Sequence, residues 1–115
     1  MNFTKMQGAG NDFIVIEAQV ADRDWSLVAR AMCDRHFGIG GDGLLVVLPS
    51  ARASLQMREF NPDGSEAEAC GNGLRCLAKY ALDKKIASSR ANQILIETAA
   101  GIRMAKVSKT GGKVT

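Results

Sequence analysis

The sequence predicts an α+β domain in which a mostly antiparallel, curved sheet is wrapped around a central core helix. Most apolar segments are short and either β-branched or alternating with polar residues, as strands are, and turn sequences join them into hairpins. Apolar residues recur at helical spacing in two segments, and the second segment is apolar enough to be buried. The expected order is two strands, a helix, two strands, a helix and two strands.

The first pair of strands is expected at residues 2–7 and 13–16. The second strand is a β-branched apolar run, which is typical of a buried strand. Between the two, the segment Gly8-Ala9-Gly10-Asn11-Asp12 has the composition of a turn. We therefore expect adjacent strands, with Asn11 at the rim of the sheet.

The first helix is expected to begin after Asp24, a good N-cap residue, and to end near Arg35 and His36. Its polar side predicts a surface helix. Residues 38–43 then read GIGGDG, which matches the letters of the dinucleotide-binding fingerprint. That fingerprint needs a strand before it and a helix after it, whereas here a helix precedes and a strand at residues 44–48 follows. We therefore exclude a dinucleotide site.

The next strand, residues 54–60, alternates apolar and polar side chains as a half-exposed antiparallel strand does. It must end at Asn61-Pro62-Asp63-Gly64, because each of these residue types favours a turn. Apolar residues then recur at helical spacing from Leu74 to Leu82 and predict the core helix. The last two strands, at residues 94–98 and 102–107, are expected to form a hairpin.

The composition limits the classes of protein to which this sequence can belong. A length of 115 residues, with 46% hydrophobic and 23% charged residues, fits one ordinary globular domain. No apolar run approaches the roughly 18 residues that span a membrane, and the N-terminus lacks the apolar core of a signal peptide. We therefore expect a cytoplasmic protein that does not act at a membrane. The formal charge of +3 comes from scattered cations and does not indicate nucleic-acid binding.

The sequence CGNGLRC at residues 70–76 places Cys70 at or near the start of the second helix. The N-terminal N–H groups and the helix dipole stabilise an anion there, whether a thiolate or a substrate carboxylate, and can lower the pKa of a cysteine toward neutrality. Gly71 and Gly73, on either side of Asn72, allow a ligand to approach the backbone closely. The local pattern fits equally well a small buried cysteine beside glycines that only serve the turn.

The cysteines predict neither a disulfide nor a metal site. The three cysteines and one histidine show no C-x-x-C or H-x-x-x-H spacing. Cys70 and Cys76, if both are helical, lie about 9 Å apart along the axis, which is too far to bridge. We interpret Cys76 as a buried structural thiol and expect Cys33, on the first helix, in the core or at the surface rather than in catalysis. His36 has the pKa range of a general base, but as a lone histidine beside a tight turn it is also interpreted as structural.

Four separated motifs stand out: GAGNDF at residues 8–13, DRHFGIG at residues 34–40, NPDGS at residues 61–65 and CGNGLRC at residues 70–76. In this order they resemble the N-terminal half of the diaminopimelate epimerase family, and the resemblance covers nearly the whole chain. It implies that family's fold and a pyridoxal-independent epimerase that uses no cofactor. Such an enzyme interconverts LL- and meso-diaminopimelate in lysine and peptidoglycan biosynthesis.

The resemblance also implies roles for single residues. In this family two cysteines face opposite sides of the substrate α-carbon, so that one thiolate removes a proton while the other thiol returns one. Cys70 matches the first of these cysteines. Asn11 and Asn61 match substrate-binding positions, and Gly71 and Asn72 match the helix-end pair whose backbone groups hold the substrate.

The family carries its other catalytic cysteine in a second, similar domain, and this sequence stops before it. Residues 1–115 are therefore expected to be an N-terminal domain that is inactive alone, its partners being an amino-acid substrate and the missing C-terminal domain. One alternative is a binding or assembly module, in which two copies associate as a homodimer and present two copies of Cys70. Another is a related amino-acid racemase of the same fold. Some family members carry a glutamine where this chain has Gly43, so that contact is not expected.

Overall fold

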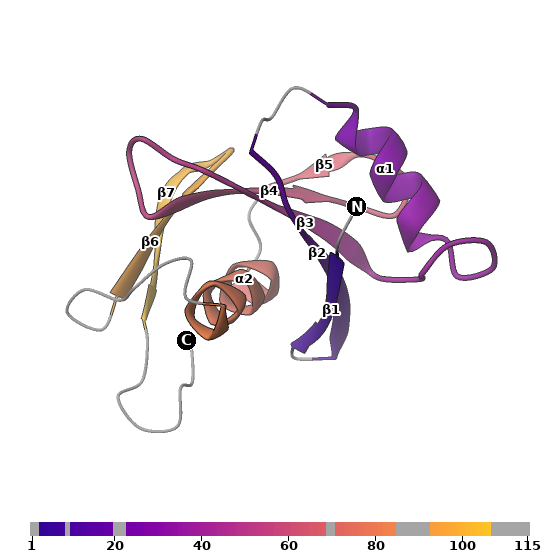
Figure 1. Ribbon diagram of the computed structural model, residues 1–115, viewed down its shortest axis with the longest axis horizontal. Helices are drawn as coiled ribbons and strands as arrows, with labels where there is room; N and C mark the ends of the chain where they lie inside the picture. The colour runs from indigo at the N-terminus through magenta and orange to yellow at the C-terminus, as the bar shows by residue number, and fades with distance from the viewer. Residues whose placement is uncertain (1–2, 9, 20–22, 69–70, 85–92, 107–115) are drawn as a thin grey trace.

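The computed structural model describes residues 3–8, 10–19, 23–68, 71–84 and 93–106, and its elements follow the predicted order with one short strand added (Figure 1). The α+β class is confirmed. Neither helix in the described part of the chain is long and apolar enough to cross a membrane. The elements are β1 (Phe3–Gly8), β2 (Asn11–Glu17), α1 (Trp25–Cys33), β3 (Gly43–Leu48), β4 (Leu55–Phe60), β5 (Glu66–Ala67), α2 (Gly71–Asp83), β6 (Gln93–Thr98) and β7 (Gly101–Lys106).

The strands form one curved sheet in the order β1-β2-β3-β4-β6-β7, with β5 paired to β4. Among the described strands, β1–β2, β3–β4, β4–β5 and β6–β7 pair antiparallel, whereas β2–β3 and β4–β6 pair parallel. Each parallel pair is connected through a helix, α1 for the first and α2 for the second. Because β2 and β3 run opposite to β4 and β6, right-handed connections place the two helices on opposite faces of the sheet. Figure 1 shows α2 on the concave face and α1 on the convex face, which confirms the predicted sheet around a central helix.

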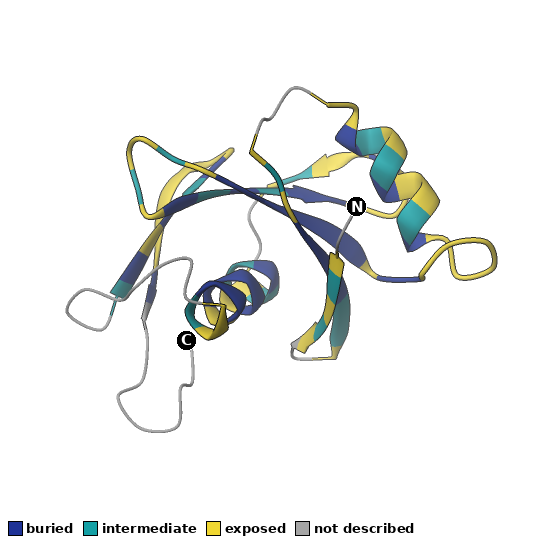
Figure 2. Cartoon of the chain, viewed as in Figure 1, coloured by how far each residue is buried: buried dark blue, intermediate teal, exposed yellow. Residues whose placement is uncertain are grey.

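The central strands are buried on both faces. In β2, Phe13 and Val15 pack in the cluster around α2, whereas Ile14 and Ile16 pack in the cluster around α1. Strand β3 alternates in the same way, and all of its residues are buried (Figure 2). This two-sided burial explains why both strands read as continuous apolar runs.

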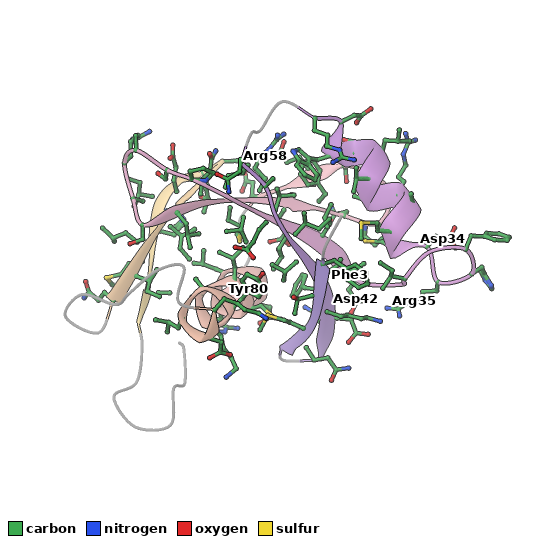
Figure 3. The ribbon with its side chains drawn as sticks, in the orientation of Figure 1. Phe3, Asp34, Arg35, Asp42, Arg58 and Tyr80 are labelled. Atoms are coloured by element: carbon green, nitrogen blue, oxygen red, sulfur yellow. The ribbon has the colours of Figure 1, made fainter. Side chains whose placement is uncertain are left out.

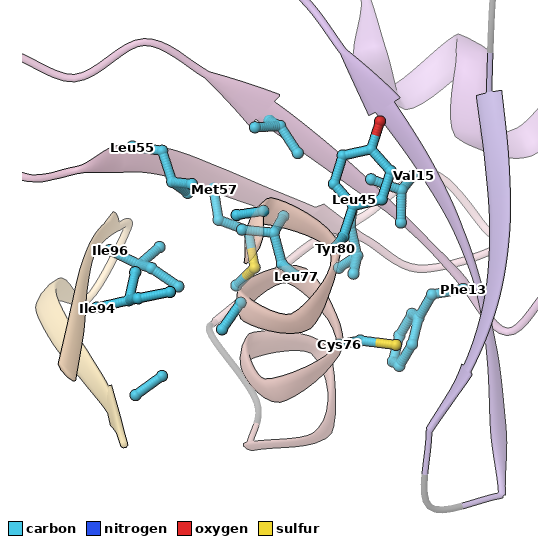
Figure 4. Packing of buried hydrophobic residues seen from close by; sticks show 14 residues of the cluster. Phe13, Val15, Leu45, Leu55, Met57, Cys76, Leu77, Tyr80, Ile94 and Ile96 are labelled. Atoms are coloured by element: carbon cyan, nitrogen blue, oxygen red, sulfur yellow. The ribbon is translucent and has the colours of Figure 1, made fainter. Parts of the chain in front are cut away.

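Helix α2 fills the concave face of the sheet, as its apolar spacing predicts. Leu77 (Figure 4), Ala78 and Ala81 are fully buried. The half-buried Leu74 and Leu82 pack against the same cluster. Full burial of one leucine side chain contributes roughly 2 kcal/mol relative to exposure. The helix is therefore held mainly by its apolar face.

Helix α1 begins as predicted but ends earlier. The Asp24 carboxylate accepts a hydrogen bond from the Leu27 N–H at 3.1 Å, which confirms the N-cap. The expected end near Arg35 and His36 is wrong, because the helix stops at Cys33. Asp34 is extended, and its carboxylate accepts hydrogen bonds from the backbone N–H groups of the two residues that start the next turn, His36 and Phe37. This competing local pattern ends the helix.

Strand β5 was not expected, because a segment of two residues has no periodicity to detect. Its pairing with β4 places Glu66 opposite Phe60. The Arg58 guanidinium of β4 donates to both Glu66 carboxylate oxygens, from Nε at 3.0 Å and from Nη2 at 2.9 Å. This bidentate ion pair fixes the segment that leads into α2.

Gly64 and Gly10 provide a matched test of how closely the turn after β4 packs on α1. Both have a left-handed backbone, with φ of +92° and +88°, so alanine costs about 1 kcal/mol or more at either position. At Gly64 a Cβ would also lie 2.9 Å from the Ser26 carbonyl oxygen and 3.0 Å from Arg30 Cγ, whereas nothing lies within 4 Å at Gly10. We expect Gly64→Ala to lower the free energy of unfolding in urea by about 1 kcal/mol more than Gly10→Ala does. An equal loss of unfolding free energy in the two variants would show that the turn and α1 separate easily.

Candidate functional site

Helix α2 runs in the same direction as β2, and two contacts fix this direction. In the first half of the helix, Cys76 packs beside Phe13, near the start of β2, in the same buried cluster (Figure 4). One turn later, the Tyr80 hydroxyl donates a hydrogen bond at 2.7 Å to Glu17 Oε2, at the end of β2. The N-terminus of α2 therefore lies at the end of the sheet where β2 begins.

Three other segments reach this same end of the sheet. Strand β2 begins at Asn11, and the parallel strand β3 begins at Gly43. Strand β4 runs the opposite way, so its last residue, Phe60, pairs with Leu44 near the start of β3. Asn61 follows directly. Residues from distant parts of the chain thus meet because of strand direction.

The structure brings Asn11, Asn61 and the helix-end pair Gly71 and Asn72 to one end of the sheet. Cys70 directly precedes Gly71 in the chain, but it lies outside the described residues. The predicted substrate-binding residues thus share a location, and the roles assigned to them stay predictions.

The turn that carries Asn61 is fixed by its own hydrogen bonds. The Asn61 backbone N–H donates to the Ser65 carbonyl at 2.8 Å, and the Asn61 side-chain amide donates to Ser65 Oγ at 2.9 Å. The Asp63 carboxylate accepts from both the hydroxyl and the N–H of Ser65, at 2.6 and 2.8 Å, and these bonds lower its pKa. The exposed Asn61 side chain is therefore presented from a rigid turn.

At the start of α2, Gly71 is exposed and Asn72 is half-buried. The Asn72 side-chain oxygen Oδ1 accepts a hydrogen bond from the Arg75 guanidinium. A Cβ on Gly71 would lie 3.2 Å from Arg75 Nη1. The helix start thus carries a guanidinium in addition to its own N–H groups, and both favour an anion there. The sequence interpretation did not single out Arg75, although a cation in the first turn of a helix is a detectable signal.

Three charged residues at this end of the sheet were also missed. Arg35 and Asp42 lie on the loop between α1 and β3, and Asp12 lies next to Asn11 in β2 (Figure 3). Arg35 Nη2 donates to Asp42 Oδ1 at 3.0 Å. Arg35 and Asp42 lie seven positions apart on one loop, but Asp12 and Asp42 are joined across 30 positions, which no local pattern shows.

Cys33 and Cys76 are both buried, on opposite faces of the sheet. Cys33 packs in the cluster around α1, and burial raises the pKa of its thiol. Cys76 packs in the cluster around α2. The interpretation of Cys76 as a buried thiol is confirmed, and Cys33, for which the sequence left core and surface open, lies in the core. His36 is exposed on the loop after α1, where its backbone N–H donates to Asp34.

A pocket lies at the opposite end of the sheet, where β2 and β3 end and β4 begins. Its lining includes Glu17, Pro49 and Ser54, and contains none of the predicted site residues. At the predicted site, Gly43 is closely packed, since a Cβ there would lie 3.2 Å from the Phe60 carbonyl oxygen and 3.3 Å from the Phe13 ring.

Solved structures share this fold. A probable proline racemase from Agrobacterium radiobacter K84 superposes with a TM-score of 0.76 at 17% sequence identity, over 96% of this chain and 38% of that chain. A methylitaconate-delta-isomerase superposes with a TM-score of 0.73 at 18% identity, over 97% of this chain and 61% of that chain. These likenesses define the class of fold, which this chain shares with a racemase and an isomerase.

Sequence comparison identifies the family within this class. The family model for diaminopimelate epimerase matches residues 3–115. A diaminopimelate epimerase from Caldanaerobacter subterraneus subsp. tengcongensis is 57% identical over 99% of this chain, and one from Pelotomaculum thermopropionicum is 47% identical over 99% of it. The chain belongs to the diaminopimelate epimerase family. It spans about 40% of the length of these relatives.

The Arg58–Glu66 pair should make stability depend on pH. The hydrogen bonds from Arg58 lower the pKa of Glu66 from its ordinary value of 4.5, so the stabilisation is present above that value and is lost as the pH falls below it. We expect Glu66→Gln to lower the free energy of unfolding by about 0.5–1 kcal/mol at neutral pH. Between about pH 6 and about pH 3, the free energy of unfolding measured in urea should fall less for the variant than for the wild type. An equal fall in both proteins would contradict this expectation.

Proposed function

We propose that this chain forms one half of the active site of a cofactor-independent diaminopimelate epimerase, in which Cys70 is a catalytic acid–base residue. One observation carries the proposal. The segments that match the family's motifs, distant in the sequence, meet at one end of the sheet beside the N-terminus of α2. Membership of the family supports the reaction, because relatives at 47–57% identity are diaminopimelate epimerases.

The proposed reaction exchanges one proton on each face of the substrate α-carbon. The Cys70 thiolate takes the α-proton and becomes a thiol, and the electron pair of the broken C–H bond moves toward the carboxylate. An opposing thiol then delivers its proton to the other face and becomes the thiolate, so the centre is inverted. In the reverse direction the two thiols exchange roles.

Stabilisation of the developing negative charge is the difficult part, because an amino-acid α-proton is very weakly acidic. Preorganised donors aimed at that charge can contribute several kcal/mol. The backbone N–H groups at Gly71 and Asn72 would hold the carboxylate there, next to the Arg75 guanidinium. Asn11 and Asn61 would orient the substrate from the strand ends.

Neither Cys33 nor Cys76 of the same chain can supply the opposing thiol. Cys33 is in the core on the convex side of the sheet, and Cys76 points into the core on the concave side beside Phe13. Both are nearly inaccessible, at 3% and 5% exposure. The location of the other two cysteines therefore supports a second domain as the source of the partner for Cys70.

A chimera tests the function directly. This chain would replace the matching part of the relative from Caldanaerobacter subterraneus, which is 57% identical. In deuterated water the chimera should exchange the α-proton of diaminopimelate, and Cys70→Ala should lower that rate by about 10²-fold or more. Cys33→Ala is the matched control and should retain exchange, because that thiol lies on the other face of the sheet. Undiminished exchange in Cys70→Ala would refute the role of Cys70.

The 115-residue chain alone should not exchange the α-proton, since it supplies one thiol of the two. Exchange by the isolated chain that rises with the square of its concentration and vanishes in Cys70→Ala would instead support a homodimer with two copies of Cys70. Exchange with other amino acids and none with diaminopimelate would support a related racemase.

Cys70 should also alkylate faster than the other two thiols in the native chain near neutral pH. The start of α2 favours a thiolate, whereas Cys33 and Cys76 are buried and burial raises the pKa of Cys33. Mass spectrometry of iodoacetamide-treated peptides measures the three rates, and the urea-unfolded chain gives the reference in which they converge. Equal native rates would contradict the expectation.

A further inference from the structure

The start of β2 is tied to the loop before β3 by a reciprocal pair of hydrogen bonds. The Asp12 N–H donates to Asp42 Oδ2 at 2.7 Å, and the Asp42 N–H donates to the Asp12 carbonyl oxygen at 2.7 Å. The β2–β3 ladder itself begins only at Phe13 and Gly43. The Asp42 side chain thus continues the contact between the two strands by one residue. It holds Asp12, which is next to Asn11.

Arg35 holds both carboxylates of this pair from the loop after α1. Its Nη2 donates to Asp42 Oδ1 at 3.0 Å, and its Nη1 lies 3.8 Å from Asp12 Oδ2 (Figure 3). The loop is itself anchored to the end of α1, because the N–H groups of residues 39 and 40 donate to the Met32 carbonyl and the Gly41 N–H donates to the Cys33 carbonyl. The clamp formed by Arg35, Asp42 and Asp12 therefore connects α1 to the start of β2.

Stability alone does not account for this clamp. The Arg35 and Asp42 side chains are 55% and 43% exposed, and exposed ion pairs of this kind contribute little to folding. What the clamp adds is a hold on the β3 side of the backbone beside Asn11, where the β2–β3 ladder has not yet begun, while β1 pairs with its other side. The hydrogen bond from Asp12 and the nearby Arg35 lower the pKa of Asp42, so its carboxylate is ionised at neutral pH.

We propose that Asp42, held by Arg35, is a positioning residue that fixes the substrate-contacting geometry of Asn11. The inference rests on the proposed function, which gives Asn11 its substrate. Asp42 does not touch the substrate in this proposal. It acts through the Asp12 backbone, and Arg35 acts through Asp42.

Amide hydrogen exchange of the 115-residue chain tests the clamp without any assay of activity. We expect Asp42→Ala to accelerate exchange at the Asp12 N–H by about tenfold or more, and to shift the Asn11 side-chain amide resonances. Arg35→Ala should act in the same direction but more weakly, because the hydrogen bond from Asp12 to Asp42 remains. Asp24→Ala is the matched control, since it also removes a carboxylate that accepts a backbone N–H, at the start of α1. Acceleration at Asp12 no larger than in Asp24→Ala would overturn the proposal.

Kinetics of the chimera then test whether the clamp acts through Asn11. Asp42→Ala should raise the KM for diaminopimelate by about tenfold with a smaller change in kcat, as loss of substrate positioning does. In a double-mutant cycle, Asp42→Ala should cause little further loss once Asn11→Ala is present. If the kinetic effects of Asp42→Ala and Asn11→Ala are fully additive, the positioning role is overturned. If Asn11→Ala leaves the kinetics unchanged, the proposed role of Asn11 fails, while hydrogen exchange still decides whether Asp42 fixes this backbone.

Discussion

The direction of α2 along β2 is the constraint on which the rest of the site depends. Two side chains set it: Cys76 packs at the start of β2 beside Phe13, and Tyr80 binds Glu17 at its end. Burial and the bond to Glu17 raise the pKa of Tyr80, so its hydroxyl remains a donor. If the helix ran the other way, its N–H groups would lie at the opposite end of the sheet from Asn11.

The sheet then supplies the remaining site residues through strand direction alone. Parallel pairing of β2 and β3 places their starts together, and antiparallel pairing of β3 and β4 returns the chain to the same end at Asn61. The two crossover helices lie on opposite faces, so α2 adds its N-terminus from the concave side while α1 braces the turn at Gly64 from the convex side. Apolar packing covers both faces of β2 and β3. The proposed site therefore lies at the sheet end, where loops and a helix terminus leave polar groups exposed.

Much of this fold could be predicted from local sequence patterns. Apolar runs and period-two alternation identified the main strands, the 3.6-residue period identified α2, and turn composition identified the turn that contains Gly64. The end of α1 was misjudged because the Asp34 carboxylate outcompetes helix continuation. The bond between Asp12 and Asp42 joins residues 30 positions apart, so no window of sequence contains it. Substrate positions came from motif resemblance, since periodicity carries no information about ligands.

The distribution of thiols is consistent with the proposal that this chain supplies half of an active site. In the proposed inversion, one face of the carbon centre needs a proton acceptor and the opposite face a proton donor, and one helix N-terminus can present a thiol to only one face. The sheet separates Cys33 from Cys76, and each is enclosed by its own apolar cluster, with 3% and 5% of its surface exposed. Exposing either thiol to a substrate would mean breaking a core to supply one reactive group. In the proposed enzyme, a second polypeptide segment over α2 would avoid that cost, and it would also exclude the water that weakens charge stabilisation at the helix start.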